Sequence, residues 1–228
     1  LSFRALDILN EVDLILCEDT RKSRILFNEF NIMTKYDSLH EFTSFKNIEK
    51  YVSYLEEGKS IALISDAGTP LISDPGFEIV KIAKEKNIFV NPLPGPSSVI
   101  SALVGSGLKI DKFIFEGFPP RKKQELENCL KYYLYEERTV VLFESPRRIK
   151  KLVQSVTEIL GKDRNVALAK EISKPHQKFI SGSSQSLLDQ IKKDNNLEKG
   201  EIVFLIEGTK EKSSIEDAEV EILVESLK

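Results

Sequence analysis

The stretch that decides the fold is IALISDAGTPLISDPG, residues 61–76. Its first four residues form an apolar run of strand length, and a loop rich in glycine and proline follows them. Asp74 and Pro75 then predict the start of a helix, with aspartate as N-cap and proline at the first helical position. A loop between a strand and a helix is where open parallel sheets bind ligands. The glycine spacing matches neither a dinucleotide fingerprint nor a phosphate P-loop.

Short apolar runs alternate with helical patterns on both sides of this loop. The runs at 12–17, 61–64 and 88–90 have strand length and are bounded by turn residues. Helices are expected over about residues 2–10, 20–30, 45–57 and 74–86, and from 98 onward. This alternation predicts a parallel sheet covered on both faces. A second stiff loop, Pro92–Ser98, follows the run at 88–90, so we expect it at the same sheet edge as the first.

The pattern changes after Lys109. Further runs predict strands at 112–116, 138–143, 166–170, 177–181 and 201–207, with helices over about 145–160 and 184–192. We therefore place a domain boundary near Phe118. The prediction is an α/β fold of two small α/β domains, a mainly parallel one over residues 1–118 and a mixed-sheet one over residues 119–210. Residues 211–228 carry six acids against two lysines, which predicts a solvated acidic tail.

The composition is that of an ordinary globular protein. The chain has 228 residues, of which 41% are hydrophobic and 30% charged, enough for a packed core. Cys17 and Cys129 lack neighbouring cysteine or histidine, so we expect neither disulfides nor a metal site. The uncharged run between Lys86 and Lys109 is broken by proline and glycine, so no membrane segment is expected. We read no signal peptide and expect a cytoplasmic protein.

Positive charge is concentrated in one segment. The net charge of −3 argues against non-specific coating of nucleic acid, but residues 119–151 hold nine basic residues against five acids. Part of this segment fits a solvated helix face with i,i+4 pairs. Two clusters differ because each follows proline at the start of an expected helix: Arg121, Lys122 and Lys123, and Arg147 and Arg148.

Several motifs together resemble a known family. They are Asp66–Gly76, Pro92–Ser98, Phe115–Phe118, Phe143–Pro146 and Gly200–Val203. In this order, from about Leu1 to Gly208, the chain resembles the tetrapyrrole-methylase superfamily, and within it the members that methylate a cytidine ribose 2′-hydroxyl in small-subunit ribosomal RNA. The resemblance implies two α/β domains with S-adenosylmethionine in the cleft between them, and a homodimer. It implies small-subunit ribosomal RNA, or the assembled small subunit, as the partner.

The resemblance also implies a set of site residues. The basic clusters are expected to bind RNA phosphates, as a polyanionic substrate requires. The residues expected against the cofactor are Ser65, Asp66, Ala67, Gly68, Thr69, Gly95, Ser97, Ser98, Phe143, Glu144, Ser145, Gly200, Glu201 and Ile202.

The sequence departs from the family pattern at three places. Relatives have a strand and an Ala-Thr-Pro-Ile-Gly-Asn-Leu loop before the helix with which this sequence opens, so we expect one strand and one wall of the substrate cleft to be missing or supplied otherwise. Lys170-Glu171 stands where relatives usually have Arg-Glu. Gln177 stands where an acidic residue is usual after His176.

Methyl transfer from a sulfonium is an in-line displacement, so the enzyme mainly needs to align oxygen, methyl and sulfur. A ribose hydroxyl also needs a general base or a polarising cation within hydrogen-bond reach. Our candidate catalytic residues are Glu18, Asp19 and Arg21, after the first strand, and each could instead be a cap or a surface ion pair. The other candidates are Glu144, Lys170 and Glu171. His40 and His176 lack a paired cysteine or a nucleophilic serine motif, so we expect them to be structural or to contact substrate.

Two alternatives stay open. One is a sister methylase that acts on a tetrapyrrole or on a modified protein histidine, against which the basic clusters argue. The other is a non-catalytic RNA-binding module without cofactor, against which the intact loop 66–76 argues.

Overall fold

The computed structural model describes residues 1–209, so the expected acidic tail at 211–228 lies outside the described residues. The chain forms two compact units, which divide between Ser97 and Ser98. Each unit has its own sheet and its own hydrophobic core.

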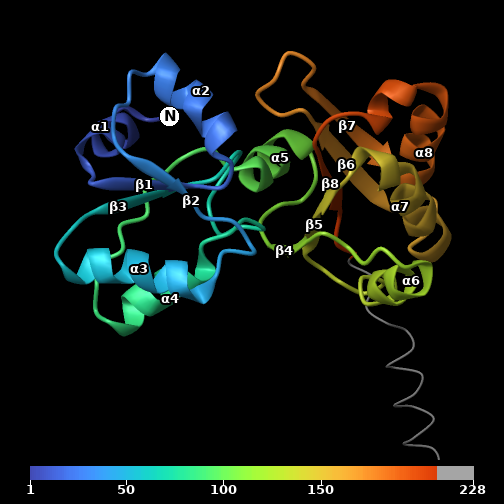
Figure 1. Ribbon diagram of the computed structural model, residues 1–228. Coiled ribbons are helices and arrows are strands. Elements are labelled where there is room, and N and C mark those ends of the chain that lie inside the picture. The colour runs from blue at the N-terminus through green and yellow to red at the C-terminus, as the bar shows by residue number, and fades with distance from the viewer. Residues whose placement is uncertain (210–228) are drawn as a thin grey trace, which may run out of the picture. The chain divides into compact units, whose positions relative to one another are not determined.

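The first unit is built on a three-stranded, wholly parallel sheet in the order β2-β1-β3 (Figure 1). Helices α1 and α2 pack against one face, where Leu9 and Phe27 meet Ile15. Helices α3 and α4 pack against the other, where Tyr51 and Ile79 meet the strands. The elements are α1 (Phe3–Glu11), β1 (Leu14–Cys17), α2 (Thr20–Glu29), β2 (Tyr36–Ser38), α3 (Phe45–Glu56), β3 (Ile61–Ile64) and α4 (Phe77–Glu85).

Local sequence signals explain where the first two helices begin. The side chain of Ser2 accepts a hydrogen bond from the Ala5 N–H, and Asp19 accepts one from the Arg21 N–H. Both residues act as N-caps, because the first N–H groups of a helix lack partners within it. The predicted parallel sheet of this unit is confirmed.

Three details of the first unit differ from the prediction. The edge strand β2 was not expected, because Tyr-Asp-Ser is short, half-exposed and lacks an apolar pattern. Residues 88–90 were expected to be a strand but form none. Helix α4 begins at Phe77 rather than at Pro75, with Gly76 as N-cap at φ +123°. The backbone needs glycine there because other residues rarely adopt this φ, and a side chain would also crowd Leu63.

The second unit contains a mixed five-stranded sheet in the order β4-β5-β8-β6-β7. Strands β4 and β5 are parallel, and β8 pairs antiparallel with both β5 and β6. This confirms the predicted mixed sheet. The elements are α5 (Ser98–Ser106), β4 (Phe113–Gly117), α6 (Lys123–Lys131), β5 (Thr139–Glu144), α7 (Pro146–Ile159), β6 (Asn165–Lys170), β7 (Lys178–Ser183), α8 (Ser184–Lys193), a short 3-10 helix (Asn195–Glu198) and β8 (Ile202–Ile206).

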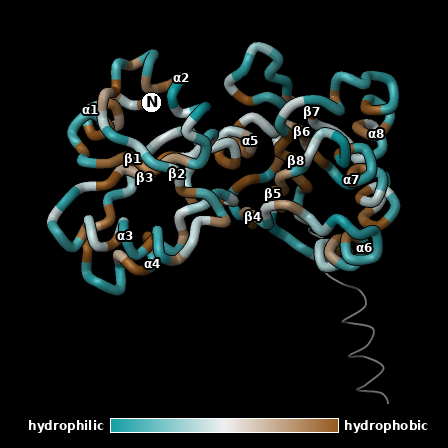
Figure 2. Tube along the Cα trace, viewed as in Figure 1, coloured by the Kyte–Doolittle hydropathy of each residue, from teal (hydrophilic) through white to brown (hydrophobic). Residues whose placement is uncertain are grey.

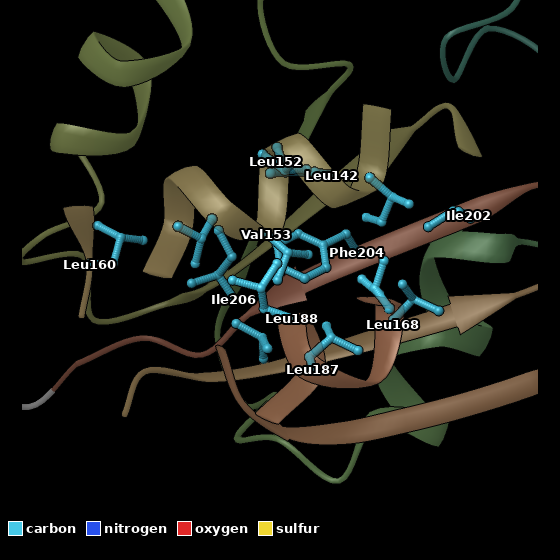
Figure 3. Close-up of a cluster of buried hydrophobic side chains, with 14 of the residues drawn as sticks. Leu142, Leu152, Val153, Leu160, Leu168, Leu187, Leu188, Ile202, Phe204 and Ile206 are labelled. Atoms are coloured by element: carbon cyan, nitrogen blue, oxygen red, sulfur yellow. The ribbon is translucent and has the colours of Figure 1, made fainter. Parts of the chain in front are cut away.

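The two faces of this sheet are covered by different helices. Leu142, Leu168 and Phe204 point to the face covered by α7 and α8, where a large apolar cluster forms (Figure 3). Alternate residues, such as Val141 and Leu205, point to the face covered by α5. Figure 2 shows hydrophobic residues concentrated along these strands. Burial on both faces explains why the strands read as continuous apolar runs.

The division at residues 97 and 98 differs from the expected boundary near Phe118. Helix α5 packs on the second sheet, because Ala102 and Leu103 belong to the same cluster as Val141. Strand β4 pairs with β5 in that sheet. Within residues 1–209 no helix is long and apolar enough to cross a membrane, and no three or more histidine, cysteine, aspartate or glutamate side chains there are grouped so that they could hold a metal ion.

Candidate active site

The loop after β3 presents open backbone. Gly68 lies at φ +82°, and a Cβ added there would meet nothing within 4 Å. The hydroxyl of Ser65 donates to the carbonyl of Ala67 at 3.3 Å. The hydroxyl of Thr69 donates to the carbonyl of Pro96 at 3.0 Å. This bond joins the two loops that the sequence placed at one sheet edge, although the second follows no strand.

Asp66 connects this loop to the loop after β1. Its Oδ1 accepts a hydrogen bond from the Asp19 N–H at 3.1 Å, and its Oδ2 accepts one from Lys22 Nζ at 2.7 Å. The side chain of Asp66 is only 14% exposed, whereas that of Lys22 is 66% exposed. Because β1 and β3 are parallel neighbours, with Cys17 opposite Ile64, their carboxyl ends meet here. Asp66 therefore fixes the backbone at the edge where ligands bind in such sheets.

Asp19 and Arg21 form a bidentate pair beside this link. Arg21 donates from Nε and Nη2 to the two carboxylate oxygens of Asp19 at 3.0 and 2.8 Å. The hydrogen bonds from the side chain and backbone of Arg21 lower the pKa of Asp19 to about 2. Asp19 is thus a carboxylate at neutral pH that orients an exposed guanidinium.

The remainder of the loop has an unusual backbone. Leu71 and Ser73 have φ values of 71° and 62°, which residues other than glycine rarely adopt. Burial raises the pKa of Asp74, and the carboxylates of Glu18 and Asp66 add to the rise. Strained residues of this kind persist where the surrounding structure holds them, and they concentrate at ligand sites.

The Phe143-Glu144-Ser145 turn lies in the second unit. Glu144 is 3% exposed. Its Oε1 accepts from the Ser145 N–H at 2.6 Å, and its Oε2 lies 3.1 Å from Nη2 of Arg148. Burial raises the pKa of Glu144, against the lowering effects of the Ser145 N–H and Arg148. Arg148 also donates to the carbonyls of Pro119 and Pro120. The predicted RNA contact Arg148 is therefore engaged within the unit.

Strand β8 begins at Ile202, which is buried, and Gly200 and Glu201 come directly before it. The Glu201 N–H donates to Oε1 of Glu171 at 2.8 Å, and this bond is the main cause that lowers the pKa of Glu171. Lys174 pairs with both carboxylates. A side chain at Gly200 would collide with Glu171. Glycine is favoured here mainly because its φ of +80° is one that other residues rarely adopt.

The basic residues divide into exposed and internal ones. Arg121 and Arg147 are exposed. Lys122 pairs with Glu125 at 2.9 Å, and Lys123 lies 3.6 Å from Glu127. Such surface pairs are weak and leave the lysines available to a stronger anion.

The structure brings together some predicted residues and not others. In the first unit, Asp19 and Asp66 are in direct contact, with Arg21 beside them. In the second unit, the Glu144 turn and the Glu171–Glu201 contact are separate groups, and Lys170 is buried in β6. His40 and His176 are exposed. Sequence reasoning missed Lys22, the partner of Asp66; its place in the first turn after the Asp19 cap was the available signal.

Curated relatives resemble most of this chain. The ribosomal RNA small subunit methyltransferase I of Escherichia coli O157:H7 is 41% identical over 207 residues, 91% of this chain and 72% of that protein. The protein of the same name from Thermotoga maritima is 42% identical over 208 residues, 91% of this chain and 92% of that protein.

Solved structures share the fold. A cobalt precorrin-4 methyltransferase superimposes with a TM-score of 0.64 at 18% identity, covering 91% of this chain and 88% of that one. A diphthine synthase superimposes with a TM-score of 0.65 at 15% identity, covering 91% and 84%. Residues 1–188 match the model of the tetrapyrrole (corrin/porphyrin) methylases, and the chain therefore belongs to this family.

Proposed function

We propose that this protein is an S-adenosylmethionine-dependent methyltransferase that methylates the ribose 2′-hydroxyl of a cytidine in small-subunit ribosomal RNA. The observation that carries the proposal is the similarity, at 41% and 42% identity over 91% of the chain, to proteins named ribosomal RNA small subunit methyltransferase I. The intact loop after β3, with its open backbone at Gly68, supports a functional cofactor site.

The residues of the first unit suit this cofactor. Open backbone at Gly68 allows close approach of a ligand, and the hydroxyls of Ser65 and Thr69 supply polar contacts. Bound S-adenosylmethionine would supply a methyl group on a sulfonium. We propose Ser65–Thr69, Gly95 and Ser97 as its binding residues here. The members of the set in the second unit, Ser98, Phe143, Glu144, Ser145, Gly200, Glu201 and Ile202, remain predictions.

The loop after β1 would serve the substrate. Asp66 holds the backbone of this loop through the Asp19 N–H. Arg21, oriented by Asp19, would attract an RNA phosphate or polarise the attacking hydroxyl. Asp19, with a pKa of about 2, is a weak base, so of the three candidates Glu18 is the one we propose to accept the hydroxyl proton.

A ribosomal substrate favours a cytoplasmic location, and we propose that the chain works there as a homodimer. The substrate is either free small-subunit RNA or the assembled subunit. Arg121, Lys122, Lys123 and Arg147 support a polyanionic substrate over a small tetrapyrrole.

Methylation of undermodified small ribosomal subunits with labelled cofactor tests the proposal. The modified nucleoside is mapped, and the linkage next to it should resist alkaline cleavage because the attacking 2′-hydroxyl is blocked. Label on a base would refute the 2′-O assignment. Labelling of a tetrapyrrole or a protein, with none on RNA, would favour a sister methylase.

A further inference from the structure

Phe118 is an exposed aromatic residue whose ring packs against another aromatic ring. Its side chain is 60% exposed, yet its ring packs edge-on to Phe143 with centroids 5.6 Å apart. Phe143 in turn packs edge-on to Phe115 at 4.9 Å. Exposure of an apolar phenylalanine ring to water is unfavourable. Edge-to-face contact between aromatic rings favours one orientation of each ring. The contact with Phe143 therefore favours one orientation of the Phe118 ring before any partner arrives.

The backbone after Phe118 is held as well. Nη2 of Arg148 donates to the carbonyls of Pro119 at 3.0 Å and Pro120 at 2.8 Å. A residue that precedes proline is restricted to extended conformations, which limits the backbone of Phe118 itself. The buried carboxylate of Glu144 lies beside Arg148 and keeps the guanidinium in place. The short segment 118–120 is thus anchored to the N-terminal end of α7.

Positive charge adjoins this ring. Arg121, Lys122 and Lys123 follow Phe118 in the chain after two prolines, and all three are exposed. Arg121 also interacts electrostatically with Glu144, which places it near the anchored segment. Arg147, the neighbour of Arg148 on α7, is exposed too. An apolar protein partner would have to desolvate these cations, whereas a nucleic acid would neutralise them.

We propose that Phe118 is a stacking platform for an unpaired base of the RNA substrate, with Arg121, Lys122, Lys123 and Arg147 holding the adjacent phosphates. The inference rests on the proposed function and adds to it a residue that contacts a base. Aromatic rings beside a basic groove bind single-stranded nucleic acid in this way, because every base has a face that can stack. The substrate region must then be single-stranded where it meets Phe118.

Binding of labelled RNA to the full chain tests the stacking role. The probes are a single-stranded RNA of about 10 nucleotides, the same backbone without bases, and the same RNA in a duplex. Phe118→Leu should weaken binding of the single strand by roughly 5- to 100-fold. It should change binding of the abasic strand and of the duplex little. Phe118→Tyr, which keeps an aromatic face, should restore affinity for the single strand.

Tyr132→Leu is the matched control. Tyr132 is 83% exposed in the same unit, at the end of α6, and outside the basic cluster. Its loss should leave all three affinities unchanged. Thermal unfolding and titration of S-adenosylmethionine with Phe118→Leu check that the fold and cofactor binding are retained.

The outcomes separate this inference from the proposed function. If the wild-type chain methylates small subunits while Phe118→Leu binds the single strand normally, the stacking role is wrong and the proposed function stands. Equal weakening for all three probes would also overturn stacking. A change in sedimentation of Phe118→Leu would assign the ring to contact between copies of the chain instead. A wild-type chain that neither binds nor methylates RNA overturns both proposals.

Discussion

Nη2 of Arg148 lies 3.1 Å from Oε2 of Glu144, but it directs its hydrogens to the carbonyls of Pro119 and Pro120. Oε2 is buried and accepts no hydrogen bond from any residue in the described part of the chain. The attraction between the two side chains is therefore electrostatic. A buried carboxylate with an incomplete set of hydrogen bonds costs stability when it is ionised.

The first prediction concerns the pH dependence of stability at Glu144. Burial raises the pKa of Glu144, so its contribution to stability is complete below the ordinary value of 4.5 and is lost as the pH rises through the folded pKa. Glu144→Gln lacks this loss. The free energy of unfolding of the variant minus that of the wild type should therefore increase from pH 4.5 upward, as measured by urea denaturation.

Glu136 provides a control of opposite sign for that experiment. Hydrogen bonds from Arg138 lower the pKa of Glu136 to about 2, so its contribution is complete above 4.5 and is lost as the pH falls toward 2. The free energy of unfolding of Glu136→Gln minus that of the wild type should therefore decrease as the pH rises from about 2 to 4.5. If the difference in unfolding free energy changed with pH in the same direction for both variants, Glu144 would not be a group that is disfavoured in its charged form.

The second prediction separates two adjacent arginines. Arg148→Ala should lower the free energy of unfolding by about 2–4 kcal/mol, because it leaves the buried Glu144 unpaired and two carbonyls without their donor. Arg147→Ala should leave stability unchanged and reduce the salt dependence of RNA binding by about one unit of slope. Chemical denaturation and RNA titration over a salt series measure both. Loss of stability in Arg147→Ala would show that it is internal too.

The third prediction tests the open loop. Gly68→Val should abolish measurable binding of S-adenosylmethionine, because a branched side chain would fill the space above the loop and strain a backbone at φ +82°. Gly58→Val is the control: Gly58 also has φ +82° and open space, so it carries a similar strain of about 1–3 kcal/mol. Calorimetric titration should show intact binding only in the control. Equal affinity in both variants would remove the cofactor from this loop.

The fourth prediction concerns the link at Asp66. Asp66→Ala removes the acceptor for the Asp19 N–H and the partner of Lys22, and should lower stability by about 1–3 kcal/mol. Asp66→Asn keeps an oxygen that can accept from the Asp19 N–H, so it should lower stability less than Asp66→Ala. Lys22→Met removes only an exposed pair and should cost about 1 kcal/mol or less. Turnover should follow the same order, and a larger effect of Lys22→Met than of Asp66→Ala would refute the link.

The fifth prediction distinguishes orientation from proton transfer. Asp19→Asn should lower turnover by the same factor at every pH above about 5, because a group with a pKa of about 2 is ionised throughout. Glu18→Gln should instead abolish most of the turnover, because it removes the proposed proton acceptor. Affinities for cofactor and RNA should stay nearly constant in both. Near-normal turnover in Glu18→Gln would move the proton acceptor elsewhere.

Much of the fold could be predicted because the strands are buried on both faces. Apolar runs such as 61–64 and 202–206 signal such strands directly. Strand β2 could not be found this way, since it is an edge strand whose pairing to β1 depends on the rest of the sheet. Residues 88–90 show the converse. They have a strand's composition, but Phe89 is exposed and no partner strand is present in the described structure.

The site was harder to predict than the fold. The Gly68 loop and the adjacent loop after β1 followed from the rule for parallel sheets, and Asp19 was recognised as a residue of that edge. The partners of the individual charges could not be predicted. Arg147 and Arg148 look equivalent in sequence, yet only the turn of α7 decides which one points to Pro119 and which to solvent.

Strand β8 is the last described strand of the chain, but it lies in the centre of the second sheet, between β5 and β6 (Figure 1). During synthesis, the first unit can fold once residues 1–97 have left the ribosome, because all of its elements lie within them. The second sheet cannot form completely until Ile202–Ile206 has emerged, so its apolar faces stay incompletely buried until then. Ribosome stalling before that point should leave the nascent chain half folded and dependent on chaperones.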